Sequence, residues 1–197
     1  MIEADLECLL AYEKININWI YKIVEFCKTN GLAFNEEKTV LIYGNNYILP
    51  LIQLSKEGLE LLLNHDFFNH KYEFRSLILN LDSILFDVDV GISIILEFDL
   101  NVITISANGG AFIWNYSENI LDSKIERLKA FTNICKGFCR LFPPKYAFLQ
   151  DESFYSNEFT VENLIKNNKK EYLFTKNFLS DKYVQDFYNF YVKNKMH

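Results

Sequence analysis

The sequence predicts one α+β domain over residues 1–197, with an antiparallel sheet packed against a long amphipathic helix and flanking N- and C-terminal helices. Three observations support this class. Segments of strand-like composition follow one another between residues 74 and 116, separated by short turns. Apolar residues then recur at helical spacing over residues 120–142. Half of the residues are hydrophobic, with only 7 glycines and 3 prolines, which is typical of one packed domain without long linkers.

Two helices are expected at the N-terminal end, over residues 3–13 and from residue 16 or 18 to residue 30. Asn16 and Asn18 can cap the second helix, and Gly31 is a typical C-terminal stop. The residues of the second helix that share one apolar face are Ile20, Ile23, Val24 and Cys27.

A β-hairpin is expected over residues 39–54, because two apolar segments flank Gly44, Asn45 and Asn46. Pro50 cannot donate a hydrogen bond to a neighbouring strand, so the second strand of this hairpin is expected at a sheet edge. A short helix is then expected over residues 56–64.

Further strands are expected over residues 74–81, 84–90, 92–98, 102–107 and 111–116, which together suggest an antiparallel meander. The turn between the third and fourth of these consists of Asp99, Leu100 and Asn101. Alternation in the second strand places one set of residues on one face: Ile84, Phe86, Val88 and Val90. The other face then carries Leu85, Asp87, Asp89 and Gly91.

The long helix is expected over residues 120–142, and its apolar stripe consists of Ile125, Leu128, Phe131, Cys135, Phe138 and Phe142. Pro143 and Pro144 end the helix, and residues 145–150 are expected to return as a strand. Beyond them, the sequence suggests a short helix over residues 161–166, a strand over residues 171–175 and a final helix. The residues of the final helix that are expected to face inward are Val184, Phe187 and Tyr191.

The charge distribution argues against a nucleic-acid ligand. The net charge is −6 and residues 1–165 are strongly acidic, so the protein is expected to repel phosphates. Residues 166–197 are basic, and aromatic residues interrupt their lysines, which favours a solvated helix face. No signal-peptide pattern is found, and no apolar run approaches the ~20 residues that cross a bilayer. We therefore expect a cytoplasmic protein with no membrane or nucleic-acid partner.

The sequence contains no signature of catalysis or of cofactor binding. The four cysteines lack CxxC spacing, so buried, reduced thiols are expected at Cys8, Cys27, Cys135 and Cys139. GxSxG, GxGxxG and GxxxxGK[ST] are also missing. A catalytic base is expected at none of the three histidines, His65, His70 and His197. We therefore expect a protein that is not an enzyme and that needs no cofactor or metal.

Four carboxylates near the middle of the chain form the first candidate site. Asp87 and Asp89 are one i, i+2 pair, and Glu97 and Asp99 are another, so each pair is expected to share one face of its strand. On adjacent strands, the two pairs would form a single acidic patch. Three interpretations are open: a solvated sheet face, a surface for a basic protein partner, or a site for a hard cation such as Mg²⁺.

A second candidate surface follows the strand expected over residues 145–150. Asp151 and Glu152 are acidic, and Phe154 and Tyr155 are aromatic. Aromatic residues beside carboxylates are typical of protein interfaces with a polar rim. A loop that folds back onto the core would show the same composition.

Residues 91–152 carry a resemblance to a known family. They begin with GISIILEFDLNVITISANGG, continue into a helix that ends GFCRLFPP, and return with KYAFLQDE. This hairpin, helix and strand resembles immunity proteins of bacterial polymorphic toxin systems. The resemblance implies a small, acidic, cytoplasmic α+β protein that binds and blocks a cognate toxin, and it implies no catalytic residues.

The predicted function is therefore that of a non-enzymatic inhibitor that occludes a protein partner, with a basic toxin as one candidate. Its binding residues are predicted to be Asp87, Asp89, Glu97, Asp99, Asp151, Glu152, Phe154 and Tyr155. A phage-encoded inhibitor of a host defence protein would have the same features. Two functions of a different kind also stay open: a metal-dependent hydrolase that uses the four carboxylates, and a structural subunit of a larger assembly.

Overall fold

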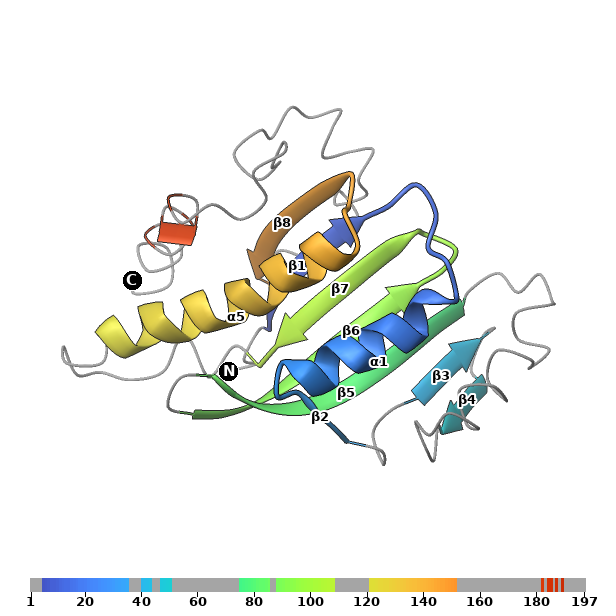
Figure 1. The fold of residues 1–197 in the computed structure, drawn as a ribbon, viewed down its shortest axis with the longest axis horizontal. Helices are drawn as coiled ribbons and strands as arrows, with labels where there is room; N and C mark the ends of the chain where they lie inside the picture. The colour runs from blue at the N-terminus through green and yellow to red at the C-terminus, as the bar shows by residue number, and fades with distance from the viewer. Residues whose placement is uncertain are drawn as a thin grey trace.

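A computed structural model describes residues 5–35, 40–43, 47–50, 75–85, 88–108 and 121–151, and residues 182, 184, 185, 187 and 189. These residues form an antiparallel sheet with the helices α1 and α5 in front of it (Figure 1). The α+β class expected from the sequence is therefore confirmed. No helix in this part of the chain has both the length and the apolarity needed to cross a membrane.

The sheet has the strand order β4-β3-β5-β6-β7-β1-β8, and β2 pairs with β5. Every pairing between these strands is antiparallel. In chain order, the strands are β1 (Leu6–Ala11), β2 (Ala33–Phe34), β3 (Val40–Tyr43), β4 (Tyr47–Pro50), β5 (Arg75–Leu85), β6 (Val88–Glu97), β7 (Val102–Ala107) and β8 (Tyr146–Asp151).

The first described element is a strand, so the helix expected over residues 3–13 is wrong. β1 pairs with β7 along one edge and with β8 along the other. Its alternate residues Leu6, Cys8 and Leu10 are buried in the core. The dense apolar run in this segment fits both helical and strand spacing. Pairing on both edges decides the outcome, because it satisfies the backbone N–H and C=O groups of a buried segment.

The meander β5-β6-β7 is present, but its first turn lies later than expected. β5 extends to Leu85 and β6 begins at Val88, so a single strand over residues 84–90 is wrong. Because Ile84 pairs with Asp89, these residues share a face. Ile84 is accordingly 70% exposed, whereas Leu85 and Val90 are buried. Alternation cannot be carried through a chain reversal, which is why the expected faces of residues 84 and 85 are exchanged.

Helix α1 (Trp19–Thr29) follows the sequence pattern closely. Its buried residues are Ile20, Ile23, Val24, Phe26 and Cys27. At its start, Asn16 Oδ1 accepts the backbone N–H of Asn18 at 2.9 Å, while Asn18 itself makes no side-chain cap. At its end, Gly31 adopts a φ of 71°, a conformation that glycine enters without a steric penalty.

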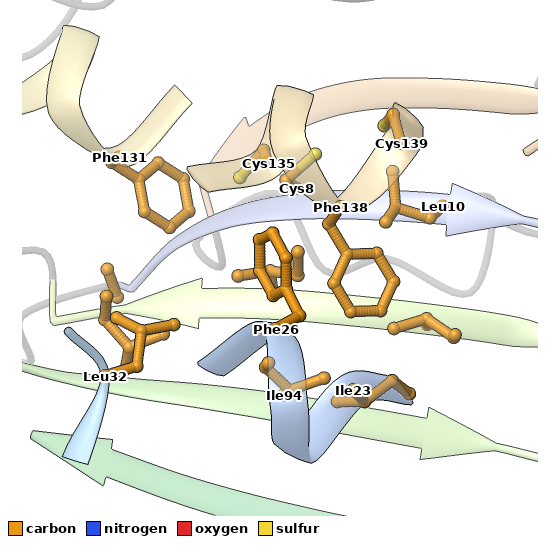
Figure 2. Packing of buried hydrophobic residues seen from close by; sticks show 14 of the residues in the cluster. Cys8, Leu10, Ile23, Phe26, Leu32, Ile94, Phe131, Cys135, Phe138 and Cys139 are labelled. Carbon is orange, nitrogen blue, oxygen red and sulfur yellow. The ribbon is translucent and has the colours of Figure 1, made fainter. Parts of the chain in front are cut away.

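Helix α5 (Leu121–Leu141) lies beside α1 on the same face of the sheet (Figure 1). The Phe26 and Phe138 rings meet between the two helices in a T-shaped contact with centroids 5.6 Å apart (Figure 2). Gly137 permits this approach, because a Cβ atom there would lie 3.1 Å from Phe26 Cε2. The buried residues that α5 contributes are Leu128, Phe131, Cys135, Phe138 and Cys139.

The hairpin of β3 and β4 is confirmed, and β4, which ends at Pro50, lies at an edge of the sheet as expected. The strand expected over residues 145–150 is confirmed as β8. Val184 and Phe187, which were expected to face inward, are buried. The other expected elements lie outside the described residues, over residues 56–64, 111–116, 161–166 and 171–175.

Replacing Phe131, which is fully buried, with alanine is expected to lower the free energy of unfolding by about 3–5 kcal/mol, because a cavity would form under α5. Leu141, 42% exposed at the end of the same helix, is the matched control. Leu141→Ala is expected to change the stability by at most ~1 kcal/mol. Urea unfolding followed by circular dichroism measures both variants, and equal losses would contradict the described packing of α5.

Candidate functional site

Two carboxylates of the first candidate site, Asp89 and Glu97, lie far apart in the structure. Asp89 and Glu97 both lie on β6, at its opposite ends. At about 3.3 Å per residue, their positions are roughly 26 Å apart. Asp99 follows Glu97 in the β6–β7 turn, and Asp87 lies outside the described residues. Asp89 and Glu97 are therefore too far apart to bind the same cation.

The second candidate surface falls almost entirely outside the described residues, which include Asp151 but not Glu152, Phe154 or Tyr155. Asp151 is the last residue of β8 and pairs with Leu6. The register of the sheet places this pair in the same row as Ala107 of β7, whereas Glu97 pairs with Val102 at the other end of that strand. Asp151 and Glu97 therefore lie near opposite ends of the sheet.

Glu97 lies on the face of β6 opposite the core residue Leu96 and is half-buried. It pairs with Ser76 of β5 and Val102 of β7. Burial raises the pKa of the Glu97 carboxyl group above its usual range. Beside it, Ser76 is also buried, and its Oγ has no hydrogen-bond partner within the described part of the chain.

The β6–β7 turn (residues 98–101) is held against the loop that connects β1 to α1 (residues 12–18). Tyr12 donates its backbone N–H to the Asn101 carbonyl at 2.9 Å, and Ile15 donates its own to Asn101 Oδ1 at 3.1 Å. Asn101 adopts a φ of 55°, a conformation that asparagine tolerates better than most residues. At the tip of the turn, the Leu100 side chain is 61% exposed. Figure 1 shows the β1–α1 connection passing this turn.

A groove of about 680 Å³ opens between the 12–18 loop and the 98–101 turn. Its size falls in the range of small-molecule sites in proteins. Trp19 forms part of the wall and is fixed by ring contacts to Tyr12 and Phe142, with centroid distances of 5.1 and 4.8 Å. The residues that line the groove are Lys14, Ile15, Asn16, Ile17, Trp19, Phe98 and Asn101.

Sequence reasoning did not find this groove, because its two walls are far apart in the chain. The hydrogen bond between Ile15 and Asn101 joins residues that are 86 positions apart. The one local signal is Asn101 itself, since asparagine in a short turn is a frequent site of positive φ. That signal predicts the turn but not the segment that packs against it.

All four cysteines are buried and reduced, as expected. Cys8 lies under α5, where its hydrogen bond with Cys135 and its burial raise the pKa of its thiol (Figure 2). Burial raises the pKa of Cys27 to about 12. The Cys8 and Cys27 thiols therefore stay protonated at neutral pH and are poor nucleophiles.

The described residues offer little for hydrolytic or metal chemistry. They include no histidine, since His65, His70 and His197 lie outside them. They also contain no group of three or more His, Cys, Asp or Glu side chains that is placed to hold a metal ion.

No protein-family model matches the sequence, and the searches of curated proteins and of solved structures also found no match. The resemblance to immunity proteins therefore stays a prediction.

Replacing Asn101 tests how the turn is held to the loop. Asn101→Ala loses both the tolerance for positive φ and the acceptor for the Ile15 N–H, so we expect a loss of about 2–3 kcal/mol in unfolding free energy. Asn101→Gly loses the acceptor alone, and a loss of about 1 kcal/mol is expected. Urea unfolding gives both values, and hydrogen exchange should show a less protected Ile15 amide in each variant. If Asn101→Ala is more stable than Asn101→Gly, the role of the positive φ at this position is contradicted.

The buried carboxyl group of Glu97 is expected to make stability depend on pH. Because its pKa is raised in the folded state, the folded protein holds this proton to a higher pH than the unfolded chain does. Its contribution is complete below the unfolded pKa, about 4.3, and is lost as the pH rises through the folded pKa. Glu97→Gln removes the loss, so the variant should gain stability relative to the wild type as the pH rises above the unfolded pKa of about 4.3. Urea unfolding from about pH 4 upward measures the unfolding free energy of both proteins. A difference between them that does not change with pH would contradict burial of the carboxylate.

Proposed function

We propose that the protein is a non-enzymatic inhibitor that binds a protein partner and occludes it, in the way that an immunity protein blocks its toxin. The observation that carries this proposal is the exposed side chain of Leu100 at the tip of the β6–β7 turn. Its neighbours in the chain are polar: Asp99, which is acidic, and Asn101, which is neutral. The half-buried Glu97 lies at the base of the same turn. An apolar side chain surrounded by polar groups is a common arrangement at the centre of a protein interface.

The two kinds of residue at this turn would have separate roles in binding. Leu100 would be the contact that is buried in the complex, since most of its side chain is exposed in the unbound protein. Asp99 and the net charge of −6 would accelerate association with a basic partner by electrostatic steering. A basic toxin that attacks nucleic acid is one partner of this kind, and a basic host defence protein is another.

A second exposed apolar residue lies at the other end of β6. Ile84 is 70% exposed and pairs directly with Asp89 across the strands. Ile84 and Glu97 both lie on the sheet face that does not carry the helices. A standard interface of about 800 Å² per partner is roughly 30 Å across, which is enough to reach from one end of β6 to the other. Thr104 and Ser106, which pair with Ile95 and Ser93 between these two ends, are buried, so a partner would contact this face at the ends of β6 and not along its middle.

Replacing Leu100 tests the predicted contact residue. The wild-type protein, immobilised and exposed to an extract of cells that carry its gene, should capture a partner whose activity it abolishes at a 1:1 ratio. Leu100→Ala is expected to weaken this complex at least about tenfold, because it removes the apolar contact. Leu141→Ala, on α5, is the control and should bind as the wild type does. A captured partner that keeps its full activity in the complex would contradict inhibition.

Reversing the charge of Asp99 tests steering at the turn. Asp99→Lys is expected to lower the association rate constant for the purified partner several-fold at low ionic strength, and the difference should shrink in about 0.5 M salt. Asp89→Lys makes the same change in net charge at the far end of β6 and should have the smaller effect. If both variants associate equally slowly, the net charge and not the turn is responsible. If neither is slower, steering by this region is wrong.

A further inference from the structure

We propose that the groove between the 12–18 loop and the 98–101 turn binds a small carboxylate that carries an aromatic ring. This inference goes beyond the proposed inhibition and does not require it. The groove holds about 680 Å³, which suits a small molecule. Lys14, Asn16 and Asn101 line the groove with hydrogen-bond donors, and the other lining residues are apolar or aromatic. A ligand that fits this lining needs both an acceptor group and an apolar ring.

The two asparagines of the groove are oriented by hydrogen bonds that use their oxygen atoms. Asn16 Oδ1 accepts the Asn18 backbone N–H at 2.9 Å, and Asn101 Oδ1 accepts the Ile15 backbone N–H at 3.1 Å. A backbone N–H can only donate, so the side-chain atom that faces it must be oxygen. Each Nδ2 group is then left as a donor, and neither has a partner within the described part of the chain. The Nδ2 groups of Asn16 and Asn101 are therefore donors that a ligand in the groove could use.

Lys14 adds a positive charge to these donors. Its ammonium group makes no ion pair within the described residues, although two acidic residues are close in sequence or space. Glu13 pairs instead with Lys145, at 3.6 Å. Asp99 belongs to the same turn as Asn101 but does not line the groove. The charge balance within the groove lining is thus positive, even though the protein as a whole is acidic.

The apolar walls supply the second half of the recognition. Trp19 is half-buried and is held in place by ring contacts to Tyr12 and Phe142. Phe98 lines the groove from the turn, and Ile15 and Ile17 complete the lining. Because the Trp19 ring is fixed before a ligand arrives, stacking on it requires little further ordering of the protein. A flat aromatic group fits these walls better than a flexible polar one.

The donor set favours a carboxylate over a phosphate. One ammonium group and two neutral amides suit a single negative charge spread over two oxygen atoms. Phosphates are usually held by several cations, by a bidentate arginine or by a cradle of backbone N–H groups. The groove lining contains no arginine and one lysine. A carboxylate joined to an aromatic ring by a short link would reach both the donors and the Trp19 wall.

Solution NMR of the ¹⁵N-labelled full-length protein tests this proposal at the atoms concerned. N-acetyl-L-phenylalanine is the probe, and it should shift the Nδ2 resonances of Asn16 and Asn101 and the Trp19 indole resonance in a saturable way. The Asn30 Nδ2 group, which already donates to Phe26 O at 2.8 Å, is the internal control and should not shift. N-acetyl-L-phenylalaninamide lacks the carboxylate and N-acetylglycine lacks the ring, so each should bind at least about tenfold more weakly.

Lys14→Gln should weaken binding of N-acetyl-L-phenylalanine about tenfold, because it removes a charge-assisted hydrogen bond. Lys22→Gln makes the same charge change on the exposed surface of α1 and should leave binding unchanged. The proposal is overturned if no saturable shift occurs at millimolar probe, if the amide binds as well as the acid, or if Lys22→Gln has the larger effect. If a peptide that ends in phenylalanine binds about tenfold more tightly than the probe, the proposal of a free small-molecule ligand is overturned. The ligand would then be the C-terminus of a polypeptide chain.

Discussion

The pairing of β1 on both of its edges is the constraint on which the rest of the described structure depends. β1 comes from the start of the chain, yet it fills the space between β7 and β8. Without it, two strands would present open edges, and a buried apolar segment would have unsatisfied backbone groups. The same pairing places Cys8 beneath α5 and directs the chain that follows β1 past the β6–β7 turn. The groove exists because of that path.

The packing of both helices on one face of the sheet determines where polar side chains can lie. α1 and α5 approach closely at Gly137, where Phe26 occupies the space that a side chain would need. Alternate residues of β6 then divide sharply: Ile92, Ile94 and Leu96 are buried under the helices. The carboxylates of this strand are left on the other face or at its ends. The position of these charged groups is therefore a consequence of how the core is closed.

Local signals in the sequence were sufficient for some of these elements and not for others. The spacing of Ile20, Ile23 and Cys27 specifies α1, and the turn at residues 98–101 follows from its own composition. β1 was missed because its apolar residues fit a helix as well as a strand, and the partners that decide between them are distant in the chain. The acidic patch failed for a related reason: Asp89 and Glu97 were assigned to adjacent strands, whereas both lie on β6. The turn falls before Val88 and not at Gly91, so Asp89 and Glu97 belong to one continuous strand.

The β6–β7 turn separates two chemically different surfaces at one end of the sheet. Glu97 lies on the face without helices, whereas the next residue, Phe98, lines the groove on the helical side. The Glu97 carboxyl group and the groove are therefore on opposite sides of the sheet. Asn101 connects the two sides, because its positive φ shapes the turn that exposes Leu100 and its Oδ1 atom holds the loop that carries Lys14. The proposed protein contact at the tip and the proposed small-molecule site in the groove would therefore share one structural support, and a ligand bound in the groove would also order the turn.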